Sequence, residues 1–404
     1  MQLVGKLLCL HLRSKMKTIN RLCFCCAGKE GVVYPLGYHF IAGVGEVDMT
    51  IRICARCGSV LQDPAPTPEM MNRYYTNYSN YTNVSRGGQP DSSYTGAVKR
   101  QINTIKKFLK PGIVFEVGCA TGFMLSKLKK DNWIVTGCDP SFAAAAVAKN
   151  TYDIDIETGL FDDITIESKS TDLVIFSHVL EHVFDPQLTL KKANRVLSPL
   201  GKILIEVPCL IYPEKWPNGY FTFEHINYFT EESLTSCLSQ QGFTLIYTSV
   251  YADNLAYPVI LVLAQKSQSK TLSEGVVDSP KKIKNLIDKY LLLDSDQWQR
   301  IDQLLYKELE EIDDVVIYGG GVHTSQLLNN TVALTHRVKC IIDTNPQKHG
   351  LDINGIKICG IEALDLNDKN SAIVISSKAY EDEIYDFLIN HVKVCSKVVR
   401  LYKY

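Results

Sequence analysis

The stretch of residues 111–122, Pro-Gly-Ile-Val-Phe-Glu-Val-Gly-Cys-Ala-Thr-Gly, decides the fold of this chain. A short apolar run leads into Glu116, Gly118 and Gly122, and the apolar residues that follow recur at helical spacing. This pattern predicts a strand, a glycine turn and a helix. Glycine lets the backbone come close to a ligand, and the start of the helix offers unpaired N–H groups. The turn is therefore expected to cradle a nucleotide.

The same residues exclude two other nucleotide-binding turns. The turn lacks the Gly-Lys-Ser/Thr ending of a Walker A loop, and it does not read Gly-x-Gly-x-x-Gly. The next predicted strand, 133–138, is followed by Asp139, which lies about twenty residues after the turn, where a carboxylate can accept hydrogen bonds from two ribose hydroxyls. The glycine turn and Asp139 together are more specific than either alone.

With residues 172–186, Asp-Leu-Val-Ile-Phe-Ser-His-Val-Leu-Glu-His-Val-Phe-Asp-Pro, this pattern resembles the class I S-adenosylmethionine-dependent methyltransferases over residues 95–265. The resemblance implies that the glycine turn holds the methionine part of the cofactor, Asp139 holds the ribose, and Asp162 or Asp163 lies beside the adenine. Another Rossmann-type nucleotide site is the alternative. The cofactor residues that the resemblance implies are Glu116, Gly118, Cys119, Ala120, Gly122, Asp139, Asp162, Asp163, Ser177 and His178.

Cysteines near the amino terminus form two Cys-x-x-Cys pairs, Cys23 with Cys26 and Cys54 with Cys57. Two tight turns can bring four thiolates around Zn²⁺, whose bonds to sulfur are about 2.3 Å long. Such a site has no open coordination position, so its role is expected to be structural. Cys25 is the spare thiol. Free thiols with accidental spacing and a redox pair are the alternatives.

Composition limits the class of protein. The 404 residues are enough for two or three domains, and the 46% of apolar residues can fill their cores. Because 43 Lys and Arg nearly balance 44 Asp and Glu, no overall charge argues for nucleic acid or a membrane surface as partner. The 13 cysteines are an odd number, which favours reduced thiols and a metal site over a disulfide framework.

The amino terminus is only weakly similar to a signal peptide, because Lys6 interrupts its short apolar stretch and no small-residue cleavage site follows. No run of about eighteen apolar residues predicts a membrane-spanning helix. We therefore expect a cytoplasmic protein. Met16 is a candidate for the natural start, which would make residues 1–15 an extension.

The segment after the second cysteine pair is rich in tyrosine. It predicts either an arm that packs against the core or a lid that offers phenol hydroxyls to a polar substrate. Residues 83–93, rich in Ser, Gly, Asn and Asp, predict a mobile loop. The tyrosines of this segment are Tyr74, Tyr75, Tyr78 and Tyr81.

Strand and helix signals alternate along the middle of the chain and predict a mainly parallel sheet with helices on both faces. The last two strands, 243–249 and 258–265, are close enough to form an antiparallel hairpin. Ligands of such sheets bind beyond the carboxyl ends of the strands, where the motif residues fall. The other predicted elements are strands at 113–117, 133–138, 172–177 and 201–207 and helices at 98–109, 122–130, 141–149 and 187–197.

A second α/β unit is predicted at the carboxyl end, after a linker at 267–280 and two amphipathic helices at 281–293 and 296–312. Gly319, Gly321 and Asp343 imitate a dinucleotide fingerprint, but Thr324 stands where the third glycine would permit close helix–strand packing. Three roles remain open for this unit: nicotinamide nucleotide binding, substrate recognition, and a structural or oligomer role.

The order of these parts resembles the sugar-nucleotide C-methyltransferases of deoxysugar pathways. In that family a segment after the fifth strand ends in Tyr-x-Glu-His, whose last His is the base. This chain keeps Glu224 and His225 but has Thr222 in place of the tyrosine. The resemblance implies His225 as base, Glu224 orienting its ring and His182 as a second acid or donor. As alternatives, His225 braces a loop, His182 is a framework residue and His178 packs in the core.

The predicted fold is α/β, with a Rossmann-like class I methyltransferase core, an N-terminal zinc-binding module and a smaller C-terminal Rossmann-like domain. The expected ligands are S-adenosylmethionine, structural Zn²⁺ and a small acceptor, a nucleotide-linked keto sugar, with a hydroxyl acceptor as alternative. We expect a monomer or homodimer with no nucleic-acid or membrane partner; a dehydrogenase and a non-catalytic scaffold are the rival classes. The expected parts are an extension at 1–20, the zinc module at 21–68, the tyrosine arm and lead-in helix at 69–110, the methyltransferase domain at 111–265, the linker and helices at 266–312, and the C-terminal domain at 313–404.

Overall fold

The structure is a computed structural model that describes residues 17–41, 44–77, 92–267, 278–378 and 380–403. Met16, Tyr78 and Tyr81 lie outside the described residues, as do most of the predicted mobile loop and most of the predicted linker. Among the described residues, no helix is both long enough and apolar enough to cross a membrane.

The central sheet has seven strands in the order β12-β13-β10-β9-β6-β7-β8, and only β13 runs antiparallel to its neighbours. This order confirms the predicted parallel sheet and its antiparallel hairpin. The strands are β6 (Ile113–Val117), β7 (Ile134–Asp139), β8 (Glu157–Thr158), β9 (Thr171–Ser177), β10 (Leu197–Pro208), β12 (Phe243–Tyr251) and β13 (Val259–Lys266).

Helices cover both faces of the central sheet because its middle strands are apolar on both faces. On β9, Val174 and Phe176 belong to one core and Leu173 and Ile175 to the other. Helices α5 and α6 contribute to the first core, and α2 and α3 to the second. The helices of this part are α2 (Ser92–Phe108), α3 (Phe123–Lys130), α4 (Phe142–Tyr152), α5 (Pro186–Val196) and α6 (Glu231–Gln240).

A four-stranded antiparallel sheet, in the order β11-β4-β3-β2, forms the N-terminal module. Its strand β11 (Asn227–Tyr228) comes from the loop after β10, so the module and the central part share a sheet. Helix α1 (Pro68–Asn77) follows the module. The other strands are β2 (Gly31–Ile41), β3 (Gly45–Cys54) and β4 (Val60–Gln62), and β1 (Thr18–Ile19) pairs separately with β5 (Ala65–Pro66).

The two helices predicted at 281–293 and 296–312 are one continuous helix, α7 (Pro280–Glu308), so the predicted break is wrong. Asp294 lies at the predicted break, and Asp is a weak helix former. In the structure Asp294 continues the buried face set by Ile287, Tyr290 and Trp298, and its carboxylate is hydrogen-bonded there. Polar partners therefore compensate for its low helix propensity.

The C-terminal unit is a six-stranded sheet in the order β16-β17-β15-β14-β18-β19, parallel except for β16. It confirms the predicted second α/β unit. Its strands are β14 (Asp314–Tyr318), β15 (Val338–Ile342), β16 (Asp352–Ile353), β17 (Ile356–Cys359), β18 (Ser371–Ile375) and β19 (Lys397–Val399), and its helices are α8 (Val322–Asn330) and α9 (Glu381–Asp386).

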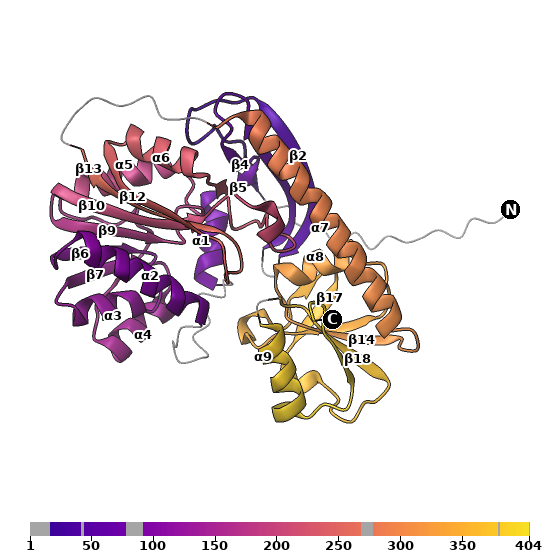
Figure 1. Ribbon diagram of the computed structural model, residues 1–404. Helices are drawn as coiled ribbons and strands as arrows, with labels where there is room; N and C mark the ends of the chain where they lie inside the picture. Colours follow the sequence, from indigo (N-terminus) through magenta and orange to yellow (C-terminus); the bar gives the residue numbers. More distant parts are fainter. Residues whose placement is uncertain (1–16, 42–43, 78–91, 268–277, 379, 404) are drawn as a thin grey trace.

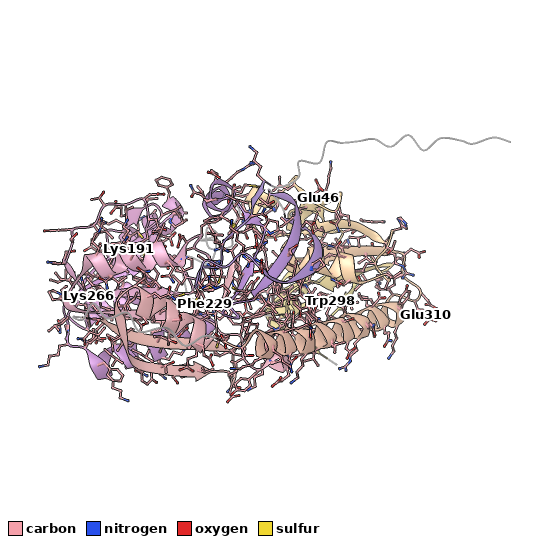
Figure 2. The ribbon with its side chains drawn as sticks, turned by 90° about the horizontal axis from the view of Figure 1, so that it is seen from above. Glu46, Lys191, Phe229, Lys266, Trp298 and Glu310 are labelled. Carbon is pink, nitrogen blue, oxygen red and sulfur yellow. The ribbon has the colours of Figure 1, made fainter. Side chains whose placement is uncertain are left out.

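Helix α7 runs along β2 and β3 and then down the C-terminal unit, so it connects that unit to the N-terminal module (Figure 1). Seen from above, Phe229 lies in the middle, between Lys191 and Lys266 of the central part and Trp298 and Glu310 of α7 and its end (Figure 2). The segment after β10 therefore occupies the junction of the parts.

Candidate active site

An open cleft of about 2700 Å³ lies between the carboxyl ends of the central strands and the C-terminal unit. It passes the glycine turn and the histidines and reaches Gly319–Gly321 of the second turn. Of the predicted cofactor and catalytic residues, the cleft is lined by Glu116, Gly118, Ala120, Asp139, Asp162, Asp163, Ser177, His178, His182, Glu224 and His225. Cys119 and Gly122 lie just beneath this surface, in the turn itself.

The glycine turn needs its glycines. Gly118 and Gly122 have φ of 65° and 74°, in the left-handed region that other residues rarely adopt. A Cβ on Gly118 would come within 2.6 Å of the Val179 side chain. Cys119 is fully buried, and its N–H donates to the carbonyl of Cys138, which joins the turn to β7. Helix α3 starts at Gly122 without a side-chain cap.

Asp139 ties the glycine turn to the next turn. Its Oδ2 accepts from the N–H of Ala120 and its Oδ1 from the N–H of Ser141, both at 2.9 Å. Burial raises the pKa of this carboxyl, and the two N–H donors oppose that shift. Each oxygen keeps a second lone pair, so Asp139 can brace the turn and still accept from a ribose.

Glu116 is buried beside the cleft, and its Oε2 has no hydrogen-bond partner among the described residues. Burial, followed by the charge of Asp139, raises its pKa well above the usual value. An orphaned buried polar atom at a cleft is costly unless a ligand or water satisfies it. The residues at this end of the cleft fit a polar cofactor that reaches past the glycine turn.

The predicted adenine and strand-end residues lie at the same end of the cleft. Asp162 accepts from the hydroxyl of Thr189, at 3.0 Å for Oδ2, and Asp163 also lines the cleft. Ser177 ends β9, and its hydroxyl accepts from Gln101 of α2 at 2.8 Å. The structure therefore brings together all the residues that the resemblance implied for the cofactor.

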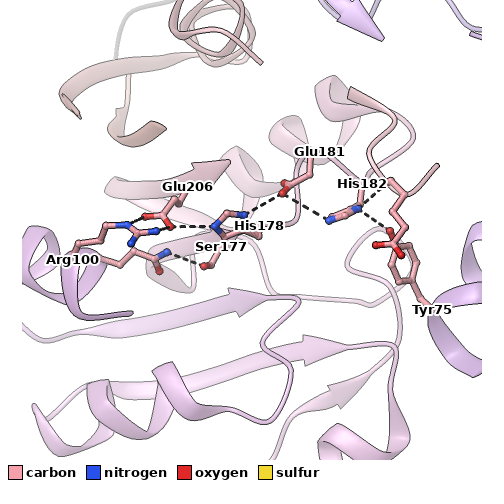
Figure 3. A network of polar contacts seen from close by, with 9 residues as sticks. Tyr75, Arg100, Ser177, His178, Glu181, His182 and Glu206 are labelled. Atoms are coloured by element: carbon pink, nitrogen blue, oxygen red, sulfur yellow. Dashed lines mark hydrogen bonds and ion pairs between the residues drawn. The ribbon is translucent and has the colours of Figure 1, made fainter. Parts of the chain in front are cut away.

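A buried polar chain that the sequence did not predict runs from α2 to the histidines (Figure 3). Arg100 donates to Glu206 through both Nε and Nη2, and Glu206 lies 3.2 Å from Nε2 of His178. His178 Nδ1 lies 3.4 Å from Glu181, whose Oε1 lies 3.8 Å from His182 Nε2. The sequence offers one indication of this chain, because Glu206 is a charged residue inside the apolar strand β10. It offers no indication that Arg100 takes part.

His178 is a charged member of this chain rather than an apolar packing residue. Burial alone would lower its pKa, but the carboxylates of Glu181 and Glu206 together raise it to about 9. The imidazole therefore carries a positive charge at neutral pH, and it compensates the two buried carboxylates.

His182 is held in one orientation. Its Nδ1 lies 2.9 Å from the carbonyl oxygen of Glu224 and 2.8 Å from the hydroxyl of Tyr75. The carbonyl can only accept, so Nδ1 carries a proton in this arrangement. In the neutral ring the lone pair is then on Nε2, on the side of Glu181.

His225 lies next to His182, with ring centroids 4.8 Å apart. Its Nδ1 is buried and has no hydrogen-bond partner among the described residues. Burial, followed by the nearby His182, lowers its pKa to about 3, so the ring is neutral at physiological pH. Ligand atoms of Glu181, His182 and His225 all lie within 4.8 Å of one another, so one carboxylate and two imidazoles converge on one region.

The sequence predicts that the side chain of Glu224 orients the ring of His225, and the structure does not show this contact. The carboxylate of Glu224 accepts from the hydroxyl of Tyr74, and no bond to the His225 ring occurs among the described residues. Tyr74 is buried and packs edge-on against Phe223, at 4.6 Å between ring centroids. The described part of the tyrosine segment thus both packs on the core and lines the cleft.

The four predicted metal ligands come together. Their sulfur atoms lie within 4.8 Å of one another, with 3.5 Å between Cys23 and Cys57 and 3.4 Å between Cys26 and Cys54. Tetrahedral Zn–S bonds of about 2.3 Å place two sulfurs about 3.8 Å apart, so this set is compatible with zinc. Cys25 is not part of this set of four, and its thiol donates to the hydroxyl of Ser236 on α6 at 3.3 Å.

The glycine turn of the C-terminal unit lines the opposite wall of the cleft. Asp343 accepts from the N–H of Gly320 at 2.8 Å, but the same oxygen also lies 3.2 Å from Nζ of the buried Lys348. Thr324, in place of the third glycine, is fully buried; its hydroxyl donates to the carbonyl of Gly319 and lies 2.7 Å from the hydroxyl of Ser376. Lys348 thus uses part of the acceptor capacity of Asp343, the carboxylate that would accept from the ribose of a nicotinamide nucleotide.

Residues 93–248 match the family model described as a methyltransferase domain. Among curated proteins, the ubiquinone biosynthesis O-methyltransferase of Coxiella burnetii is 33% identical over 100 residues, which are 24% of this chain and 43% of that protein. The chain thus spans less than half the length of the curated relatives it matches.

Similar solved structures include a putative S-adenosylmethionine-dependent methyltransferase from Listeria monocytogenes, at 15% identity, with 43% of this chain and 100% of that chain covered and a TM-score of 0.38. Another is the 1,6-didemethyltoxoflavin-N1-methyltransferase of Burkholderia thailandensis with S-adenosylhomocysteine bound, at 14% identity, with 57% and 100% covered and a TM-score of 0.42. The family match and the strand order of the central sheet identify residues 93–248 as a class I methyltransferase domain, the class that uses S-adenosylmethionine.

Replacing Cys54 by Ser should remove one ligand of the four-sulfur set and unfold the N-terminal module, because structural zinc contributes roughly 10 kcal/mol or more of apparent folding free energy. Elemental analysis of the purified protein should find one zinc per chain, and the variant should lose it. Cys25→Ser is the matched control and should keep both metal and fold. A wild-type protein without stoichiometric metal would contradict the site.

Replacing His178 by Asn should flatten the dependence of stability on pH. The folded-state pKa of His178, about 9, is above the ordinary 6.5, so its ion pairs stabilise fully below pH 6.5 and are lost as the pH rises through about 9. At 1.36 kcal/mol per pKa unit, the wild type should lose about 3 kcal/mol over that range that the variant does not lose. Urea unfolding at pH values below 6.5 and above 9 measures this, and the exposed His391→Asn serves as control. Equal losses in His178→Asn and wild type would disprove the ion pairs.

Proposed function

We propose that the chain is an S-adenosylmethionine-dependent methyltransferase that C-methylates a nucleotide-linked keto sugar, with His225 as the general base. The observation that carries the proposal is the shared cleft, which runs from Gly118 and Asp139, past His182 and His225, to Gly319–Gly321. A cleft with a glycine turn at each end suits a two-part acceptor, whose reacting part lies near the first turn and whose nucleotide lies near the second.

The cofactor would lie along the first turn. Gly118 and Ala120 let the backbone approach its methionine part, Asp139 would accept from its ribose, and Asp162 or Asp163 would lie beside its adenine. Bound S-adenosylmethionine would supply an activated methyl group, so the protein has to align the acceptor and remove its proton.

The histidines would handle the acceptor's proton. His225 is neutral, so its ring has a lone pair to take a proton from the carbon beside a ketone. Its pKa of about 3 makes it a weak base, and a negative charge forming on the acceptor would raise that pKa. The charged His178 and the hydroxyl of Tyr75 line the same wall and would stabilise the forming enolate.

Methyl transfer to a hydroxyl is the second candidate function. The ubiquinone biosynthesis O-methyltransferase among the relatives favours it, and Thr222 in place of a tyrosine supports it. In that reaction His225 would take the hydroxyl proton directly. The position of Lys348 against Asp343 argues against a nicotinamide-dependent dehydrogenase.

Replacing Asp139 by Asn should weaken S-adenosylmethionine binding by about tenfold to a hundredfold, because a charge-assisted bond to the ribose contributes about 1.5 to 3 kcal/mol. The new NH₂ group would also face the N–H of Ala120 or Ser141. Calorimetric titration with S-adenosylmethionine measures the loss, and the exposed Asp155→Asn is the control. Unchanged affinity in Asp139→Asn would overturn the cofactor assignment.

Replacing His225 by Ala should lower the turnover of methyl transfer to a panel of nucleotide-linked 4-keto sugars by about a hundredfold to ten-thousandfold, with S-adenosylmethionine affinity unchanged. His391→Ala, on an exposed histidine, is the control. With a carbon acceptor, the wild type should also exchange the acceptor's hydrogen with deuterated water, and the variant should not. Methyl transfer without such exchange would favour the hydroxyl acceptor, and full activity of His225→Ala would remove it from the mechanism.

A further inference from the structure

The loop that carries His225 belongs to the central part, but each of its ends is held by another element. After His225, the N–H groups of Ile226 and Asn227 donate to the carbonyl of Glu181 at 2.9 and 3.0 Å. Arg21 of the N-terminal module donates to the carbonyl of Ile226 at 2.7 Å. The carboxyl end of the loop is therefore fixed beside the cleft.

The amino end of the loop is held by α7, which lies outside the methyltransferase domain. The N–H of Tyr220 donates to the hydroxyl oxygen of Tyr290 at 2.8 Å, and that hydroxyl lies 3.0 Å from the carbonyl of Pro217. One side chain of α7 thus bonds both ends of the turn 217–220. Because Pro217 lines the cleft, the turn is part of the cleft wall.

Asp294, one helical turn after Tyr290, adds a second bond to the same turn. Its Oδ1 accepts from the N–H of Gly219 at 3.0 Å, and its Oδ2 accepts from Nε1 of Trp298 at 3.2 Å. A carboxylate in the middle of an apolar helix face has a desolvation cost, which raises its pKa, and the N–H donors of Gly219 and Trp298 offset part of that cost. These hydrogen bonds explain why a charged residue, Asp294, lies on the buried face of α7.

Packing around the turn leaves it little freedom. Trp216 stacks on Tyr220, with ring centroids 4.5 Å apart, and lies 5.1 Å from the ring of Tyr290. Gly219 has φ of 62°, and a Cβ there would come within 2.0 Å of the side chain of Gln326 on α8. Helix α7 and helix α8 of the C-terminal unit therefore both fix the backbone of the turn.

We propose that Tyr290 and Asp294 are positioning residues for His225, so that the C-terminal helix α7 sets the place of the base in the methyltransferase cleft. The proposal rests on the proposed function, in which His225 takes the proton. The span from the turn 217–220 to Ile226 is short and held at both ends, so a shift at the turn moves His225. Trp298 extends the contact toward the cleft wall of the C-terminal unit, since its ring lies 5.7 Å from His323.

The test uses the full-length protein with Tyr290→Phe, which removes the hydroxyl and keeps the buried ring. The matched control is Tyr306→Phe on the exposed side of the same helix. Turnover is measured with the panel of nucleotide-linked 4-keto sugars, S-adenosylmethionine affinity by calorimetry, and amide hydrogen exchange in the peptide that contains Gly219 and Tyr220. Asp294→Ala and Asp294→Asn form a second pair, because Asn keeps an oxygen that can accept from Gly219.

Tyr290→Phe and Asp294→Ala should lower turnover by about tenfold to a hundredfold, since small misplacements of a reacting group have effects of that size. S-adenosylmethionine affinity should stay within about twofold of the wild type. Exchange at the turn should rise about tenfold, the equivalent of one lost hydrogen bond. Asp294→Asn should recover most of the turnover, and Tyr306→Phe should match the wild type.

Faster exchange with unchanged turnover would overturn the proposal, because the turn would then be structural only. Unchanged exchange in both Tyr290→Phe and Asp294→Ala would overturn it as well. If the wild type transfers no methyl group to any acceptor of the panel, the proposed function fails by itself. In that case the placement of His225 is tested by the rate at which diethyl pyrocarbonate carbethoxylates its ring, measured by mass spectrometry. That rate should change at least about fivefold in Tyr290→Phe for a loop that α7 positions, and an unchanged rate would reject the inference.

Discussion

The carbonyl of Glu181 is the point on which the arrangement of the parts depends. It accepts backbone bonds from Ile226 and Asn227, and these residues lead directly into β11, which completes the sheet of the N-terminal module. Arg21 bonds the same backbone from the module side. Because Glu181 and His182 follow β9 and His225 precedes β11, this junction brings the two histidines together.

The two α/β units use one device to shape their glycine turns. In each, an Asp at the end of the second strand accepts from the N–H two residues on and from an N–H of the glycine turn: Asp139 from Ser141 and Ala120, and Asp343 from Asn345 and Gly320. The units differ in what else reaches that carboxylate. Lys348 lies against Asp343, whereas the described residues place no cation on Asp139. Asp139 thus keeps free lone pairs that can accept from a ligand, whereas Lys348 already occupies part of the acceptor capacity of Asp343.

The sequence predicted those features whose determining residues lie close together in the chain. The glycine turn, the apolar strands around it and the two cysteine pairs each have a signal within a few residues, and the structure confirms the fold and brings the cysteines together. The contacts that join distant segments had no such signal. Arg100 with Glu206 and Tyr74 with Glu224 depend on the tertiary arrangement, and so does the bond from the N–H of Gly219 to Asp294, where the helix was predicted to break. The predicted side-chain bond from Glu224 to His225 failed for the same reason, since Tyr74 holds that carboxylate.

The charges around the cleft have consequences for a reaction that forms an anion. Arg100 and His178 compensate Glu206 and Glu181, so the buried chain is neutral as a whole, with its positive members interleaved between the carboxylates. His225 lies beyond the end of this chain and is uncharged, because burial, followed by the nearby His182, lowers its pKa to about 3. An anion forming on an acceptor would reverse that balance and make protonation of His225 favourable. The low pKa of this histidine therefore fits a base whose strength develops only as negative charge forms on the acceptor.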